Sequence, residues 1–267
     1  MSARLVLRSE SRAPEVHATA DAEIAVYSRP SPDRQGPNED AAGLWDLGAG
    51  RLVLAVADGM GGAPSGADAA EIALRELDHQ LAEAPLDRDL RPAILDAFER
   101  ANAAILGLGV GAGTTLVAAC IEGERVRMFH VGDSAGLVVG QRGRWKLETI
   151  AHSPVGYGVA AGLIDPETAL ERDDRHYLSN HLGTRDMRIE IGSARVLAPR
   201  DTGLLASDGL LDNLTPDEIN GIIRRGPLDA AAAQLAARCG ERMPGEGGTG
   251  PGKADDVTFV LFRRRPR

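Results

Sequence analysis

The chain has 267 residues, of which 43% are hydrophobic, and a formal net charge of −9 at pH 7. This length is enough for one domain to bury a substantial core, and the apolar runs are too short to span a membrane. The acidic balance argues against nucleic acid as the main partner, because phosphate backbones are bound by clustered Lys and Arg. Two Cys residues far apart provide no disulfide framework, and residues 1–14 lack the apolar segment of a signal peptide, so we expect a cytoplasmic protein.

The first half of the chain contains predicted strands followed by two predicted helices. Residues 1–20 are expected to be a flexible leader or an added edge strand. The continuous apolar run at 52–57 is typical of a strand buried in a sheet sandwich. Apolar residues at helical spacing predict helices at 65–83, with Ser65 as the N-cap, and at 89–107.

The second half returns to strands and ends with two more helices and a last strand. Residues 114–131 predict a β-hairpin, and residues 151–185 mix Gly, Asp and His without a clear period, as expected of a flap. Thr215-Pro216-Asp217-Glu218 has the pattern of a capping box with Pro at the first helical position. The remaining strands and helices are predicted at 202–206, 215–225, 228–242 and 257–262.

Three short acidic segments each adjoin a predicted strand. They are Asp58-Gly59-Met60-Gly61-Gly62, Ser207-Asp208-Gly209 and Asp255-Asp256. A single Asp-Gly pair is ordinarily a turn, but these segments, with Asn38-Glu39-Asp40 upstream, form a more specific set. If the strands lie side by side, their carboxylates emerge at one edge of the sheets, where oxygen ligands can surround Mg²⁺ or Mn²⁺.

Taken in order, these motifs resemble those of the metal-dependent Ser/Thr protein phosphatases of type 2C, in their bacterial form. The matching segments are 38–40, 58–62, 113–115, 131–134, 176–183, 207–210 and 255–258. The resemblance covers roughly residues 22–263 and implies an α+β fold, a four-layer α-β-β-α sandwich of two antiparallel sheets flanked by helix pairs. It also implies a single phosphatase domain at 21–265 with the flap at about 151–185.

The resemblance implies a site for two divalent ions, Mn²⁺ or Mg²⁺. The expected metal ligands are Glu39, Asp40, Asp58, Gly59, Asp133, Asp208, Asp212 and Asp255. Asp58 would bridge both ions, and Gly59 would contribute its carbonyl. Glu39 would bind one ion, and Asp208 and Asp255 would bind the other.

Three of these positions have supporting roles in the resemblance. Asp40 would orient metal-bound water, and Asp133 and Asp212 match the positions that hold a looser third ion. The predicted reaction is hydrolysis of phosphoserine and phosphothreonine in proteins by a water bridging two cations, which lower the pKa of that water and hold the phosphoryl group. The residues expected to carry this reaction are Asp58, Asp208 and Arg34.

The chain departs from the family pattern at several positions. The family usually has a phosphate-binding Arg four residues before the Glu, where this chain has Gln35, and Arg34 is the candidate replacement. Ala135 and Ala151 stand where the family has Arg and Asp. These departures leave open a catalytically weak or inactive regulatory pseudophosphatase that binds a phosphoprotein. The expected partners are a phosphoprotein substrate and an opposing Ser/Thr protein kinase, with no nucleic acid, no membrane and a monomeric chain.

Two further patterns concern other chemistries, nucleotide binding and transition-metal binding. Residues 247–254 fit Gly-x-x-x-x-Gly-Lys, but Ala254 lacks the hydroxyl that a nucleotide-binding loop needs for Mg²⁺, so a loop before the last strand is expected and a nucleotide hydrolase is the third hypothesis. His152, His176 and His181 match no transition-metal spacing, and surface or local hydrogen-bonding roles are expected for them.

Overall fold

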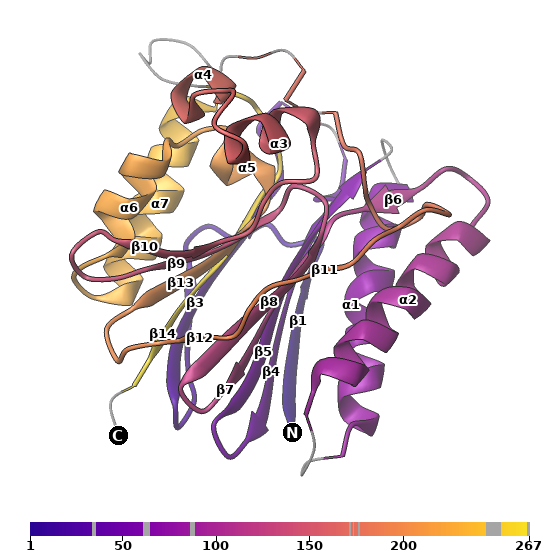
Figure 1. The fold of residues 1–267 in the computed structure, drawn as a ribbon, viewed down its shortest axis with the longest axis horizontal. Coiled ribbons are helices and arrows are strands. Elements are labelled where there is room, and N and C mark those ends of the chain that lie inside the picture. The colour runs from indigo at the N-terminus through magenta and orange to yellow at the C-terminus, as the bar shows by residue number, and fades with distance from the viewer. Residues whose placement is uncertain are drawn as a thin grey trace.

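The chain folds into two antiparallel sheets that pack face to face, with helices on the outer faces (Figure 1). The structure is a computed structural model. It describes residues 1–33, 36–60, 65–85, 89–170, 172, 174–175, 177–243 and 252–265. The predicted α+β class with two antiparallel sheets is confirmed.

The first sheet is built around the strands that the sequence placed at 52–57 and 114–131. Its order is β1 (Ser2–Leu7), β4 (Asp40–Gly48), β5 (Arg51–Met60), β7 (Leu116–Glu122), β8 (Arg125–Val131) and β11 (Glu190–Ile191). Two short strands lie off this path, because β12 (Arg195–Val196) also pairs with β8 and β6 (Gly113–Thr114) pairs with β5.

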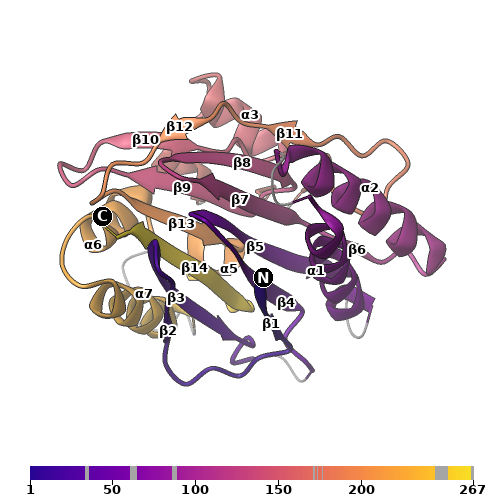
Figure 2. The same cartoon turned by 90° about the horizontal axis from the view of Figure 1, so that it is seen from below.

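The second sheet joins strands from both ends of the chain. Its order is β10 (Trp145–Glu148), β9 (Ala135–Val139), β13 (Thr202–Ala206), β14 (Val257–Arg264), β3 (Ala22–Arg29) and β2 (Glu15–Ala18). The first 20 residues thus contain two strands, β1 and β2, at edges of the two different sheets. Figure 2, seen from below, shows the two sheets side by side between the helix pairs, with the C-terminal strand β14 between β13 and β3 in the second.

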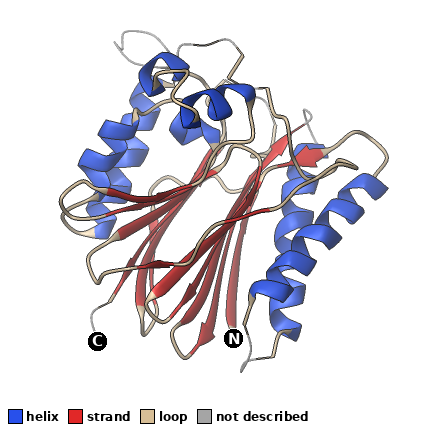
Figure 3. Cartoon of the chain, viewed as in Figure 1, coloured by secondary structure: helices blue, strands red, loops and turns tan. Residues whose placement is uncertain are grey.

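Two pairs of helices cover the sheets, and three short helices lie at one end (Figure 3). The first sheet is covered by α1 (Ser65–Glu83) and α2 (Arg91–Gly107), and the second by α6 (Pro216–Ile223) and α7 (Leu228–Arg242). The short helices are α3 (Pro154–Ala160), α4 (Pro166–Leu170) and α5 (Asp208–Leu211). Within the described residues, no helix is both long and apolar enough to cross a membrane.

Alternate side chains of β5 pack in two different hydrophobic cores, one on each face of the first sheet. Leu54 and Val56 pack in the core between the sheets, whereas Ala55 and Ala57 pack in the core beneath α1 and α2. A third core lies between the second sheet and α6 and α7. Successive side chains of a strand point to opposite faces, so a run that is apolar at every position is what two buried faces require. By the same alternation, Asp58 belongs to the face between the sheets.

The structure extends one predicted element and confirms the capping box. The segment Asp58-Gly59-Met60 was expected to follow its strand, but β5 continues through Met60, because Gly59 and Met60 pair with β6. At α6, the Thr215 hydroxyl accepts a hydrogen bond from the Glu218 amide, and the Glu218 carboxylate accepts one from the Thr215 amide.

Candidate metal centre

Two aspartates lie directly opposite each other at the end of the first sheet. Asp40 opens β4 and Asp58 lies near the end of β5, and the strand register pairs one with the other. Both continue the alternation that faces the second sheet, since Ala42 and Val56 of the same strands lie in the core between the sheets. Like charges directly opposite in an antiparallel pair repel each other. The fold therefore places two carboxyl groups where only a proton or a cation can relieve the repulsion.

The Gly-Thr-Thr segment fixes the backbone of Asp58. The Asp58 amide donates to the Thr115 hydroxyl at 3.1 Å, and the Asp58 carbonyl accepts from the Thr115 amide at 2.9 Å. The Thr114 hydroxyl donates to the same carbonyl at 2.8 Å. The two threonines thus fix the position of the strand end that carries Asp58. The sequence motif at 113–115 therefore has a structural role.

Two glycines allow the loop that carries Glu39 to approach the start of α1. A Cβ on Gly59 would lie 2.2 Å from the Gly66 carbonyl oxygen, and a Cβ on Gly66 would lie 2.9 Å from Oε2 of Glu39. Neither position can hold a larger residue without a shift. Glu39 itself is 2% exposed, so its carboxylate is held inside the molecule next to the strand that carries Asp58.

Asp256 is a buried carboxylate to which the sequence assigned no role. Its Oδ1 accepts from the Ser31 amide at 2.8 Å, and its Oδ2 accepts from the Glu39 amide at 2.7 Å. Asp256 precedes β14 and Glu39 precedes β4, so this residue ties the two sheets together beside the acidic group. The double Asp in the sequence was the available signal, although only Asp255 was expected in the site.

The second sheet contributes the remaining carboxylates. Ser207 follows β13 and donates its hydroxyl to Oδ2 of Asp40 at 2.7 Å. Asp208 and Asp212 then lie at the start and just after the end of α5, and Asp255 lies before β14. These three surround Lys253, whose Nζ lies 2.8 Å from Asp208, 2.8 Å from Asp255 and 3.2 Å from Asp212. Arg175, 3.3 Å from Asp212, adds a second cation from the expected flap.

Burial and mutual repulsion raise the pKa of four of these carboxyl groups. Burial raises the pKa of Asp58 well above its usual range, and the charges of Asp40 and Asp208 raise it further. Burial also raises the pKa of Asp40, although the hydrogen bond from Ser207 opposes it. The pKa of Asp133 is raised to about 8 by burial and by Asp208 and Asp212, and burial and Asp208 raise that of Asp255. This concentrated negative charge favours a bound cation.

The donor set suits the Mn²⁺ or Mg²⁺ that the family comparison implies. Carboxylate oxygens are the ligands that these hard ions prefer. Oδ1 of Asp40 is buried and has no hydrogen-bond partner among the described residues, so it can accept from a group that enters the site. The oxygens of the described carboxylates are not close enough for one ion to contact three of them. Among the described residues, no three Asp or Glu place one oxygen each within 4.8 Å of one another.

Several predicted positions lie outside the described residues. These are Arg34, Gln35, Gly61, Gly62, His176 and residues 247–251 of the Gly-Lys segment. Of that segment, Lys253 contacts three carboxylates, and the strand β14 follows rather than a helix. A nucleotide-binding loop needs its lysine free for phosphates and a helix after it, so these contacts favour the predicted loop.

A second cluster of potential metal ligands lies in His130, His152 and Glu190. Its hydrogen bonds oppose metal binding. Nδ1 of His152 accepts from the Gly132 amide at 3.1 Å, so the ring proton is on Nε2, which lies 3.2 Å from Glu190. The Asn180 amide also faces Nδ1, and its other contacts fix its orientation. If a metal bound Nε2, the ring proton would have to move to Nδ1, which already accepts a hydrogen bond. His152 therefore has a local hydrogen-bonding role, as expected from the sequence.

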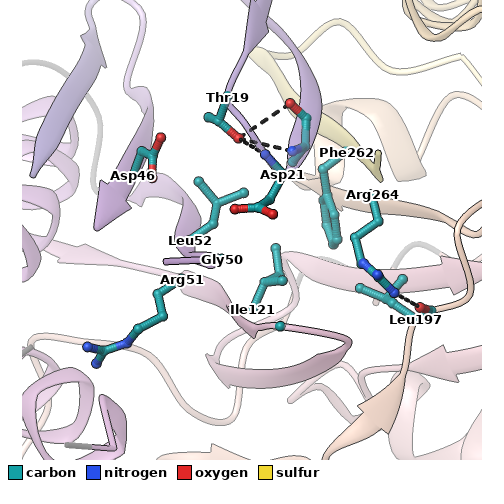
Figure 4. A pocket seen from close by; sticks show the side chains of 12 residues that line it. Thr19, Asp21, Asp46, Gly50, Arg51, Leu52, Ile121, Leu197, Phe262 and Arg264 are labelled. Atoms are coloured by element: carbon teal, nitrogen blue, oxygen red, sulfur yellow. Dashed lines mark hydrogen bonds between the residues drawn. The ribbon is translucent and has the colours of Figure 1, made fainter. Parts of the chain in front are cut away.

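A small cavity of about 20 Å³ lies at the opposite end of the sandwich (Figure 4). It lies between the turns that join β2 to β3 and β4 to β5, and Asp21, Arg51 and Arg264 line it. That volume is enough for a water molecule and too small for an organic ligand. The acidic end, where α5 lies in Figure 1, is therefore the better candidate for chemistry.

The family model described as protein phosphatase 2C matches residues 32–235. The chain belongs to the protein phosphatase 2C family. The protein phosphatase PhpP of Streptococcus pneumoniae is 30% identical over 195 residues, which cover 70% of this chain and 78% of PhpP. The predicted family and the prediction of an enzyme, a protein phosphatase, are confirmed.

Solved structures agree with this assignment. The serine/threonine phosphatase of S. agalactiae superposes with a TM-score of 0.78 at 27% identity, covering 91% of this chain and 99% of that one. The catalytic domain of the serine/threonine protein phosphatase PstP, in complex with two manganese ions, has a TM-score of 0.70 at 26% identity, covering 92% and 99%. The family is metal-dependent, and one of its members in this fold binds manganese.

Proposed function

We propose that this phosphatase hydrolyses phosphoserine and phosphothreonine in proteins with two divalent ions, Mn²⁺ or Mg²⁺, at the acidic end of the sandwich. The observation that carries the proposal is the direct pairing of Asp40 with Asp58 on the face between the sheets, next to Asp208 and Asp255 from the other sheet. This pairing is unfavourable without positive charge. A phosphate monoester has the same need, because its own charge repels a nucleophile.

Some of these residues would bind the ions, and one would orient the attacking water. Asp58, Asp208 and Asp255 would hold the ions, with Glu39 on the α1 side and the Gly59 carbonyl beside it. Bound Mn²⁺ or Mg²⁺ would supply the charge that lowers the pKa of a water and neutralises phosphoryl oxygens.

Asp40 would have a separate task in this proposal. The Ser207 hydroxyl occupies its Oδ2, and its Oδ1 is buried with no hydrogen-bond partner among the described residues. That oxygen would accept a hydrogen bond from the attacking water and orient it. Asp133 and Asp212 would hold a looser third ion, and Arg34 would bind the substrate phosphate.

The test is hydrolysis of a phosphothreonine peptide with and without Mn²⁺, for the wild type beside Asp58→Asn. Asparagine keeps the shape of the side chain but removes the charge, so we expect Mn²⁺-dependent turnover to fall at least about a thousandfold. Thermal unfolding should show that the variant is folded. Turnover by Asp58→Asn at the wild-type rate would contradict the proposal, and Asp21→Asn, at the opposite end, is the matched control.

The contacts of Lys253 favour one alternative, a regulatory pseudophosphatase. An ammonium group that neutralises Asp208, Asp212 and Asp255 could leave a site that binds a phosphoprotein without turnover. Ala135 and Ala151, where the family has Arg and Asp, also favour a pseudophosphatase. Rapid Mn²⁺-dependent turnover of the peptide would exclude this alternative.

The biological setting belongs to the same proposal. A phosphoprotein substrate follows from the family, and we propose an opposing Ser/Thr protein kinase, a monomeric enzyme and a cytoplasmic location. Copurification of a kinase that phosphorylates the substrate, and a sedimentation mass of one chain, would support this setting.

A further inference from the structure

Lys253 is a cation placed among the carboxylates of the proposed metal site. Its Nζ lies 2.8 Å from Oδ2 of Asp208 and 2.8 Å from Oδ2 of Asp255. A third carboxylate, Asp212, lies at 3.2 Å. The contact with Asp208 is also a hydrogen bond, and the other two are ion pairs. The side chain is 30% exposed, so the group is partly open to solvent.

The three acceptors come from two separate segments of the second half of the chain. Asp208 and Asp212 belong to α5 and its C-terminal end, whereas Asp255 precedes β14. Six-coordinate Mg²⁺ has bonds of about 2.1 Å, so the oxygens that bind it lie within about 4.2 Å of one another. No three Asp or Glu among the described residues come within 4.8 Å in this way. With Lys253 in place, no three of the described carboxylates are therefore close enough for one ion to contact them all.

We propose that Lys253 is a built-in competitor for the divalent cations of this site. Its ammonium group holds Asp208, Asp212 and Asp255 in the metal-free protein and must withdraw before these carboxylates close around an ion. The inference rests on the proposed function, whose metal site it refines. Its consequence is a site that is stable without metal and that fills only at a higher ion concentration than the same carboxylates alone would need.

The chain offers a matched control for the charge of Lys253. Lys146, in β10, is 33% exposed, and its Nζ lies 2.5 Å from Oδ2 of Asp201. The two lysines therefore have similar exposure, and both are ion-paired, Lys146 with one carboxylate and Lys253 with three. They differ in that the partner of Lys146 is not among the proposed metal ligands.

The experiment is calorimetric titration of metal-free protein with Mn²⁺, together with the thermal midpoint of each metal-free protein. The proteins are the wild type, Lys253→Gln, Lys253→Arg and Lys146→Gln. We expect Lys253→Gln to bind Mn²⁺ at least about tenfold more tightly, because the ion no longer displaces a cation from the carboxylates. The same variant should have a lower metal-free midpoint, since Asp208 and Asp255 lose the charge of Lys253 and Asp212 keeps the ion pair with Arg175. Lys253→Arg and Lys146→Gln should keep the wild-type affinity.

Two results would overturn the inference alone. One is equal Mn²⁺ affinity in Lys253→Gln and the wild type. The other is an equal gain in Lys146→Gln, which would show only a change in net charge. Failure of all four proteins to bind Mn²⁺ would overturn the proposed metal site and this inference together, so the two failures can be told apart.

Discussion

Asp256 is a carboxylate beside the proposed metal site whose contacts are with backbone amides. It is 4% exposed and accepts one amide hydrogen bond with each oxygen, from Ser31 and from Glu39. Hydrogen bonds to a charged acceptor are stronger than those between neutral groups. The position of Glu39 therefore depends on a residue more than two hundred positions later in the chain.

At this scale, we expect Asp256→Ala to weaken both the fold and the metal site. Two amides lose their acceptors, at a cost of about 1–3 kcal/mol for each one left unsatisfied. Because the Glu39 loop loosens, the affinity for Mn²⁺ should fall about 10–100-fold. Chemical denaturation and calorimetry measure the two effects. Asp46→Ala, which removes a single contact to Gly48 in an exposed turn, should leave Mn²⁺ binding unchanged, and wild-type affinity in Asp256→Ala would contradict the positioning role.

Among the elements, β5 and α6 show which local patterns determine structure. The Asp-Gly pair of β5 is not a turn, because Gly59 lets the strand pass against Gly66 and continue to Met60. The capping box of α6, in contrast, is formed as its four residues predict. Four neighbouring residues in the sequence were enough to predict the helix cap. The end of β5 could not be predicted in this way, because it depends on the close approach of Gly59 to Gly66 of α1.

The cap supplies a prediction at the scale of one helix. Thr215→Ala removes the acceptor of the Glu218 amide, so the free energy of unfolding should fall by about 1 kcal/mol. Thr215→Ser keeps the hydroxyl and should retain the wild-type stability in urea denaturation. Because α6 lies over the second sheet and supplies no expected ligand, Mn²⁺ affinity should be the same in both variants. A change in affinity would show that the helix cap and the metal site are coupled.

For the whole molecule, the metal-free protein should lose stability as pH rises from 7 to 8. Burial with Asp208 and Asp212 raises the pKa of Asp133 to about 8, so its folded form keeps a proton that the unfolded chain has released. The stabilisation from such a group is complete below its unfolded pKa, falls as pH rises above that value, and is lost once pH passes the folded pKa. Burial lowers the pKa of His130 and His152, so they are largely neutral in both states above pH 7.

Thermal melting at pH 7.0, 7.5 and 8.0 tests this expectation. The midpoint of the metal-free protein should fall across the series, and the fall should be smaller in Asp133→Asn, which has no carboxyl to ionise. Saturating Mn²⁺ should flatten the trend, because the ion stabilises the ionised form. A midpoint that rises with pH in the absence of metal would contradict the assigned cause.

Sequence patterns sufficed for the regular parts of the molecule and for the order of its motifs. The bounds of α1, α7 and β13 agree with the predicted ranges, because each is a periodic or continuous apolar run. The role of Lys253 could not be predicted, since its three partners come together only when α5 packs beside β14. Asp256 was missed for the same reason, because its partners, the amides of Ser31 and Glu39, come from the other end of the chain.

Both ends of the described chain lie at the end of the molecule away from the acidic site (Figure 1). Ser2 pairs with Asp46 and Arg264 pairs with Ala22, whereas Asp40 and Asp58 occupy the other ends of their strands. A linker to a biosensor surface or to a fluorescent protein could thus be attached at either terminus without covering the acidic end proposed as the catalytic site. Immobilised through such a linker, the enzyme would present that end to phosphoproteins in the flowing sample.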